Sequence, residues 1–169
     1  MKLARPAVLA LIVAVGAATA FAGWRTLAAR EPAPAVSYTL LDGSKASLES
    51  MRGKVLLVNF WATSCTTCVA EMPQIVATHD KFKSRGYETV AVAMSYDQPA
   101  YVARFAETRK LPFGVAIDNT GAVAKSFGDV QMTPTTFLID KQGRVVKRYL
   151  RAPDFPALHA LIGELLAEG

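Results

Sequence analysis

The feature that most constrains this chain is an apolar run that leads directly into its only two cysteines. Residues 54–61 read KVLLVNFW, a length and composition typical of a strand buried on both faces of a sheet. Cys65 and Cys68 follow it after a short loop. Residues three apart share one face of a helix, so these two sulfurs could bridge at a helix start. We therefore predict a cysteine pair at the carboxyl end of a central strand.

Strand-like and helix-like segments alternate through the rest of the chain. Alternation favours parallel strands, and a final hairpin adds antiparallel ones. The prediction is an α/β fold with a central mixed sheet and helices on both faces. The predicted strands are 54–61, 87–94, 113–117, 135–139 and 144–150, with a turn at 140–143. The predicted helices are 65–84, broken or bent at Pro73, then 99–109, 119–127 and 156–167, the last capped by Asp154.

The first thirty residues differ from the rest in composition. Residues 6–24 carry no charge and follow Lys2 and Arg5. A helix of that length is about 28 Å long, close to the thickness of a bilayer core. The small-residue triplet ending at Ala22 fits a signal cleavage site, so one interpretation is a cleaved signal sequence and the other, which we favour, is a retained anchor. A helix buried in the protein core is the third alternative.

Charge separates this N-terminal segment from the domain that follows. The formal net charge is +5, but residues 1–30 hold four basic residues and no acid, which leaves 15 basic and 14 acidic residues in 31–169. Interspersed charges of that balance do not indicate a nucleic-acid surface. Two prolines in 31–35 predict a stiff extended spacer. The expected domains are therefore 1–30 as signal or anchor, 31–36 as linker and 37–169 as the folded domain.

The cysteine spacing points to redox chemistry. Free N–H groups and the dipole at a helix start stabilise a thiolate at Cys65, which can attack a disulfide, and Cys68 can then resolve the mixed disulfide. One alternative is an inert structural disulfide, which would close too short a loop to stabilise much. Another is half of a zinc site, for which only His79 and His159 remain as further ligands. We expect no metal.

Two motifs resemble the thioredoxin superfamily, and specifically the TlpA/ResA-like membrane-tethered thiol–disulfide oxidoreductases. They are VNFWATSCTTC at 58–68 and TPTTFLID at 133–140, about 70 residues apart in the expected order. The resemblance covers 37–169 and implies a thioredoxin-like fold. It also implies that Thr133–Pro134 is a cis peptide facing the cysteines, where the backbone of Thr133 pairs with a bound substrate chain. An ordinary trans turn proline is the alternative.

The resemblance assigns roles to further residues. Members similar to ResA carry an acid at the position of Glu71 that tunes the cysteines, and a raised pKa beside Trp61 and Pro134 would suit proton exchange with Cys68. A solvated glutamate near a helix start is the alternative. Asn59 stands where thioredoxin itself has an acid. The expected substrate-binding residues are Trp61, Ser64, Thr66, Thr67, Thr133 and Pro134.

Two departures from the family bear on direction and partner. Ser64 replaces a common tryptophan, which removes apolar surface beside the attacking cysteine. Thr66 and Thr67 place no histidine between the cysteines, and a histidine there is one device of the strong oxidants. We therefore expect a reductant.

The expected function is reduction of disulfides in exported proteins, for example apocytochrome c, on the periplasmic side of a bacterial inner membrane. Electrons would come from a thiol donor such as a membrane transporter of reducing equivalents, and no cofactor or nucleic acid is expected. The alternatives are a net thiol oxidase or isomerase, a copper-binding assembly protein of the same fold, and a thiol peroxidase. The cysteine spacing is one residue short for the copper protein, and the proline of the peroxidase motif is missing.

Overall fold

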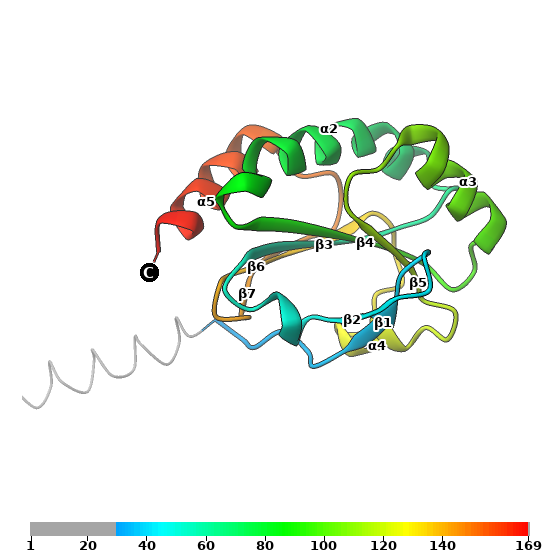
Figure 1. Cartoon of the computed structure of the whole chain (residues 1–169), viewed down its shortest axis with the longest axis horizontal. Helices are drawn as coiled ribbons and strands as arrows, with labels where there is room; N and C mark the ends of the chain where they lie inside the picture. Colours follow the sequence, from blue (N-terminus) through cyan, green and yellow to red (C-terminus); the bar gives the residue numbers. More distant parts are fainter. Residues whose placement is uncertain (1–29, 169) are drawn as a thin grey trace, which may run out of the picture. The chain divides into compact units, whose positions relative to one another are not determined.

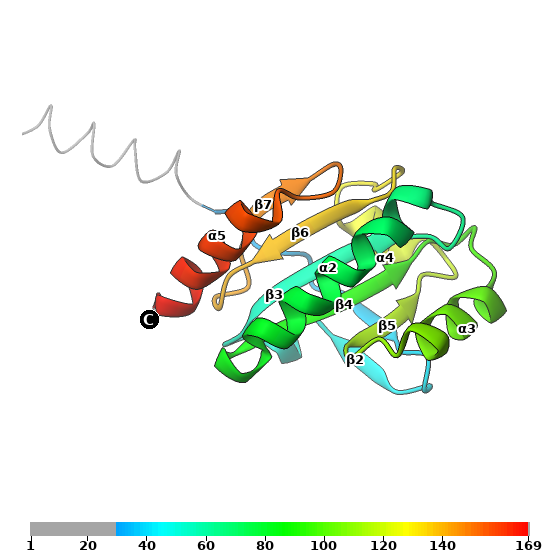
Figure 2. The same cartoon turned by 90° about the horizontal axis from the view of Figure 1, so that it is seen from above.

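The computed structural model describes residues 30–168 of the chain, shown in Figure 1 and, from above, in Figure 2. Its strands are β1 (Ser37–Thr39), β2 (Lys45–Ser47), β3 (Val55–Trp61), β4 (Tyr87–Ala93), β5 (Gly114–Ile117), β6 (Thr135–Ile139) and β7 (Val145–Tyr149). Its α-helices are α2 (Thr66–Phe82), α3 (Pro99–Arg109), α4 (Ala122–Ser126) and α5 (Phe155–Ala167), with short 3-10 turns η1 (Glu49–Met51) and η2 (Lys83–Arg85).

Five strands form the central sheet in the order β5-β4-β3-β6-β7. β3 pairs in parallel with β4, and β4 with β5. β6 runs antiparallel to both β3 and β7. The predicted mixed sheet, with parallel strands first and a closing hairpin, is confirmed. β3 lies in the middle, which explains why all seven of its residues are buried.

Each face of the sheet has its own covering layer. Helices α2, α3 and α5 lie on one face, and α4 with the β1–β2 hairpin lies on the other (Figure 1). Successive side chains of a strand point to opposite faces, so β3 supplies both cores. Leu57 and Trp61 pack with the core under α2 and α5. Leu56, Val58 and Phe60 pack with the core on the α4 side. The helices on both faces were predicted.

Helix α2 begins at the cysteine pair because Cys65 is its N-cap, with extended backbone. The helix continues through Pro73 to Phe82, so of the two expected outcomes, a break or a bend at that proline, the break does not occur. Met72 and Ile75 on its inner face are buried, and this packing holds the turn that lacks one backbone donor. The 3-10 turn η2 follows the helix, and Gly86, with a φ of 91°, ends that turn before β4 begins.

The segment expected to be a spacer is part of the folded unit. The carbonyl of Glu31 accepts from Val145 N at 2.7 Å, and Ala33 N donates to the Gly143 carbonyl at 2.8 Å. Pro32 forms a bridge opposite Arg144. The compact unit accordingly runs from Glu31 rather than from residue 37. Alternating proline and alanine favour extended backbone, and an extended chain beside a sheet edge pairs with it.

The predicted signal or anchor at 6–24 lies outside the described residues. Within 30–168, no helix is both long enough and apolar enough to span a membrane. The short strands β1 and β2 were not predicted, since three residues give no clear periodicity.

Candidate active site

The two cysteines lie at the carboxyl end of β3, as predicted. They form a disulfide with Cα atoms 5.2 Å apart. Cys65 is half-buried and Cys68 is fully buried. The backbone N–H of Cys68 donates to Cys65 Sγ at 3.2 Å, so the first sulfur occupies the position of a helix-capping acceptor. A thiolate there would be stabilised by the same N–H group and by the helix dipole.

The Thr133–Pro134 peptide bond is cis, which confirms the expected isomer. Thr135 pairs with Phe60 in the antiparallel β3–β6 ladder, so the residues just before β6 lie at the same end of the sheet as the residues just after β3. Pro134 is buried and Thr133 is half-buried. The pairing of β3 with β6 thus brings together two segments about 70 residues apart in the sequence.

Glu71 belongs to a buried polar cluster beneath the cysteines. Its side chain is 4% exposed. Asn59 Nδ2 donates to Glu71 Oε1 at 3.1 Å and to Thr136 Oγ1 at 2.9 Å, and Glu71 Oε2 has no hydrogen-bond partner. Burial raises the pKa of Glu71 to about 7, and the hydrogen bond from Asn59 opposes that rise. The alternative of a solvated glutamate is therefore wrong.

Trp61 does not lie where a substrate-binding residue must lie. Its side chain is 0% exposed, and its ring centroid is 5.0 Å from that of Phe105 on α3. A side chain without accessible surface cannot contact a bound protein. The seven-residue burial of β3 extends through Trp61, and this places the indole in the core under the helices. The prediction that Trp61 contacts the substrate is therefore wrong. Its ring packs in the core beneath the helices instead.

The other expected contact residues reach the surface. Ser64, Thr66 and Thr67 are exposed around the cysteine pair. Two exposed apolar side chains near the cis proline were not predicted: Met132 is 62% exposed and Tyr96 is 58% exposed. Tyr96 Oη lies 3.3 Å from Thr133 Oγ1. These two side chains provide apolar surface at a site that lacks the tryptophan common at position 64.

Sequence reasoning also missed Asp97. Its carboxylate accepts from Thr63 N at 2.5 Å, from Thr63 Oγ1 at 2.6 Å and from Gln98 N at 3.0 Å. In the sequence, an aspartate two residues before Pro99 resembles an ordinary cap of the helix that starts there. The contact with Thr63 comes from strand order, because β4 lies beside β3 and their carboxyl ends meet.

The two histidines pack within the fold. His79 Nδ1 lies 3.3 Å from Thr89 Oγ1, and His159 Nε2 lies 2.8 Å from Thr78 Oγ1. Burial lowers the pKa of both. Across residues 30–168, no group of three or more His, Cys, Asp or Glu residues is placed to hold a metal ion.

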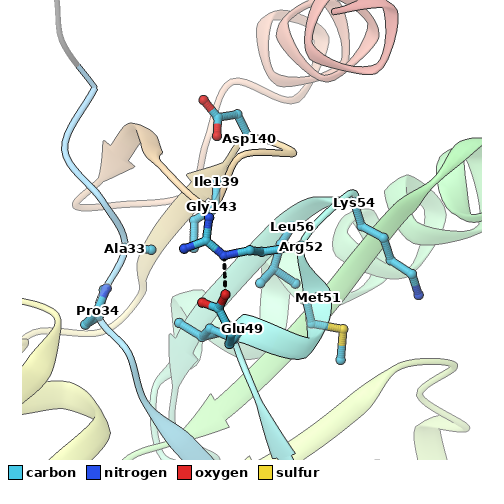
Figure 3. A pocket seen from close by; sticks show the side chains of 11 residues that line it. Ala33, Pro34, Glu49, Met51, Arg52, Lys54, Leu56, Ile139, Asp140 and Gly143 are labelled. Atoms are coloured by element: carbon cyan, nitrogen blue, oxygen red, sulfur yellow. Dashed lines mark ion pairs between the residues drawn. The ribbon is translucent and has the colours of Figure 1, made fainter. Parts of the chain in front are cut away.

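Figure 3 shows a small cavity lined by Lys54, Leu56 and Ile139, among others. It lies at the start of β3, whereas the cysteines follow the end of that strand. Arg52 crosses it, with its guanidinium between Glu49 and the chain at Ala33 and Gly143. Arg52 Nε lies 2.6 Å from Glu49 Oε1, and Arg52 Nη1 donates to the Gln142 carbonyl at 2.7 Å. The volume of about 20 Å³ holds about one water molecule.

Comparison with known proteins agrees with this geometry. The redoxin family profile matches residues 28–162, most of the chain. The chain belongs to the redoxin family. The thiol-disulfide oxidoreductase ResA of Bacillus thuringiensis subsp. konkukian is 38% identical over 115 residues, which cover 68% of this chain and 65% of that protein. ResA of Geobacillus thermodenitrificans is 35% identical over 147 residues, covering 85% and 83%. The chain thus spans just under two thirds of the first of these relatives.

Solved structures confirm the thioredoxin-like fold. A putative thioredoxin from Neisseria meningitidis has a TM-score of 0.75 and 38% identity, covering 81% of this chain and 91% of that one. A thiol:disulfide interchange protein from Chlorobium tepidum also has a TM-score of 0.75, at 28% identity, covering 83% and 99%. The redoxin-family fold and the cysteine pair therefore occur together in this chain.

Proposed function

We propose that the protein is a thiol–disulfide oxidoreductase that reduces disulfides of exported proteins. The observation that carries the proposal is the arrangement of the cysteines. Cys65 is accessible at the start of α2, Cys68 is buried behind it, and the cis proline lies at the same end of the sheet. The similarity to ResA supports the same activity.

The reaction consists of two exchange steps. In the reduced protein, the thiolate of Cys65 attacks one sulfur of a substrate disulfide, forms a mixed disulfide and releases the other substrate sulfur as a thiolate. Cys68 then loses its proton and attacks Cys65 Sγ, which frees the second substrate thiolate and leaves the Cys65–Cys68 disulfide. Two electrons pass from the protein to the substrate. The disulfide in the structure is the product of this half-reaction.

Glu71 is suited to handle the proton of Cys68. It lies one helical turn beyond Cys68 on α2, and both are buried. A carboxylate with a pKa of about 7 can accept a proton at neutral pH and return it to solvent, which a carboxylate with an ordinary pKa does less effectively. Glu71 Oε2, which has no partner, is the oxygen available for that proton.

The substrate chain would pair with the backbone of Thr133 and contact the exposed side chains around the cysteines. The absence of a histidine between Cys65 and Cys68 supports net reduction. A thiol donor must then re-reduce the disulfide, and a membrane transporter of reducing equivalents fits that need. Exported proteins such as apocytochrome c are the proposed substrate class. Residues 6–24 would place the protein on the periplasmic side of an inner membrane, as anchor or as cleaved signal.

The test is capture of the mixed disulfide. The Cys68→Ser variant lacks the resolving thiol, so a substrate attacked by Cys65 should stay covalently attached. We expect a disulfide-bonded adduct with an oxidised protein substrate on non-reducing gels, absent from Cys65→Ser and released by dithiothreitol. An adduct that forms equally with Cys65→Ser, or no turnover of a protein disulfide by the unsubstituted protein, would contradict the proposal.

A further inference from the structure

The loop between β4 and α3 holds the turn that carries Cys65. Cys65 N donates to the Ala62 carbonyl at 3.1 Å, which closes a four-residue turn from Ala62 to Cys65. Thr63 is the second residue of that turn. Both of its polar hydrogens, on the backbone nitrogen and on the hydroxyl, are donated to the carboxylate of Asp97. The turn is therefore tied to a residue 34 positions further along the chain.

Asp97 is itself fixed in place. Its side chain is 7% exposed. Its backbone N–H donates to the Met94 carbonyl at 3.0 Å, and Met94 N donates to the Trp61 carbonyl at 3.0 Å. The carboxylate also accepts from Gln98 N, directly before α3. The ends of β3 and β4 and the start of α3 thus place this carboxylate.

The position of the turn matters for the thiolate. Cys65 Sγ is stabilised only while it stays at the N-terminus of α2, within reach of Cys68 N. Ser64, the third residue of this turn, is exposed, so burial of its side chain does not hold the turn in place. In the reduced protein, where the Cys65–Cys68 disulfide no longer ties the turn to α2, the bonds from Thr63 to Asp97 are a side-chain restraint on this loop.

We propose that Asp97, acting through Thr63, is a positioning residue that holds the turn of Cys65 so that its thiolate stays at the N-terminus of α2. This inference rests on the proposed function, because it concerns the attacking sulfur of that reaction.

The test compares variants of Thr63 in the full-length protein. Thr63→Val keeps the shape and the backbone donor but removes the hydroxyl donor, without changing any charge. Thr63→Ser restores the hydroxyl. The readouts are the thiol pKa of Cys65, from the pH dependence of its alkylation in a Cys68→Ser background, and kcat/KM for reduction of a protein disulfide in the background that keeps both cysteines.

We expect Thr63→Val to raise the Cys65 pKa and to slow alkylation at pH 7 about three- to tenfold, since the thiolate fraction falls as the pKa rises. kcat/KM should fall in parallel, and Thr63→Ser should stay within about twofold of the unsubstituted protein because it keeps the hydrogen bond.

The pKa of Cys65 depends both on the charge of Asp97 and on the position of the turn, so the test must distinguish the two effects. On its own helix, the titratable groups that follow Cys65 most closely in sequence are Cys68 and Glu71, and the loop after β4 that binds Thr63 carries Tyr96 and Asp97, while Thr133 and Pro134 before β6 are uncharged. A negative charge at Asp97 disfavours a thiolate, so its removal alone would lower the Cys65 pKa. Thr63→Val leaves that charge in place, so a rise in the Cys65 pKa does not come from adding or removing a charge.

The matched control is Asp118→Asn. Asp118 is also a buried carboxylate, and it accepts from Val123 N at 3.1 Å and Ala124 N at 2.7 Å at the start of α4. The Asp118→Asn substitution should lower the stability of the fold without changing the pKa of Cys65. An unchanged pKa and rate in Thr63→Val, or an equal pKa shift in Asp118→Asn, would overturn the inference. If the unsubstituted protein fails to reduce a disulfide, the proposed function fails instead.

Discussion

At the scale of single residues, Glu71 links the stability of the fold to its chemistry. A buried carboxylate with one hydrogen bond and one oxygen without a partner is costly when ionised, because burial disfavours the charged form. Asn59 stabilises the ionised form in part. The balance puts the pKa of Glu71 at about 7, so both protonation states are populated at neutral pH. The raised pKa of Glu71 suits proton exchange with Cys68, but ionising the buried carboxyl group lowers the stability of the fold.

The sign of the effect on stability follows from proton uptake. Between about pH 4.5 and 7 the folded protein holds a proton on Glu71 that the unfolded chain has released, so stability falls as pH rises through this window. Glu71→Gln removes this dependence. We expect the oxidised variant to match the unsubstituted protein near pH 4 and to exceed it by up to roughly 3 kcal/mol at pH 8.

Urea denaturation from pH 4 to 8 measures this difference, with Glu164→Gln as the control because Glu164 is exposed on α5. If Glu71→Gln and the unsubstituted protein show the same pH profile, Glu71 does not have the raised pKa.

Sequence reasoning succeeded for residues whose role depends on a local pattern. Recognisable motifs contain or adjoin Cys65, Cys68, Glu71 and Pro134. The structure places the cysteines and the proline at one end of the sheet, with Glu71 buried one helical turn after Cys68. It failed for Trp61, because a motif does not reveal whether an aromatic ring points outward or into the core. It missed Asp97, because the partner Thr63 is 34 residues away and only the neighbouring positions of β3 and β4 bring them together.

At the scale of elements, the segment 31–36 behaves as an additional edge of the sheet. Its backbone bonds to Gly143 and Val145 lie beside β7, which is otherwise the edge strand. Exposed edges are sites of unwanted pairing, and covering one is a common protection. The sequence predicted an extended conformation for this segment, but composition alone does not show whether an extended chain is free or paired.

The pairing can be tested within the full chain by removing one donor. Ala33→Pro eliminates the N–H that bonds the Gly143 carbonyl, and we expect a loss of about 1–2 kcal/mol in the free energy of unfolding. Ala35→Pro is the matched control, because Ala35 is exposed and its N–H makes no backbone hydrogen bond in the structure. Urea denaturation at fixed pH compares the two variants. Equal stability for both would show that the segment is a free spacer.

The longer elements were predictable and the short ones were not. Strands 54–61 and 87–94 are almost continuously apolar and lie in the sheet centre as β3 and β4. Helix α2 was predicted in place, but as broken or bent at Pro73. The helix is not broken, because the packing of Met72 and Ile75 offsets the cost of a proline inside it. β1 and β2 have three residues each, too few for a periodic signal.

At the scale of the whole folded unit, the site and the paired residues 31–33 lie at opposite ends of the sheet. The cysteines follow Trp61 at the end of β3, beside the start of β6, whereas Val145, which bonds Glu31, pairs with Ile139 at the far end of β6. Residues 31–33 therefore do not cover the surface around Cys65. That arrangement leaves the exposed residues around the disulfide available to another protein.

The fold as a whole was predicted because its signals agree: a buried strand before the cysteines, a proline before a later strand, and alternation between them. The direction of electron transfer could not be predicted in the same way. It depends on how strongly the thiolate of Cys65 is stabilised in the reduced protein, and a few hydrogen bonds to that sulfur determine this stabilisation.

The central claim is most directly tested by the midpoint potential of the Cys65–Cys68 couple. A titration against glutathione or dithiothreitol buffers gives it, with Cys65→Ser as the blank. The account predicts a potential of about −220 mV or lower, in the range of the reducing members of this fold. A potential near about −120 mV, which characterises a strong oxidant, would contradict the reductase and favour a thiol oxidase.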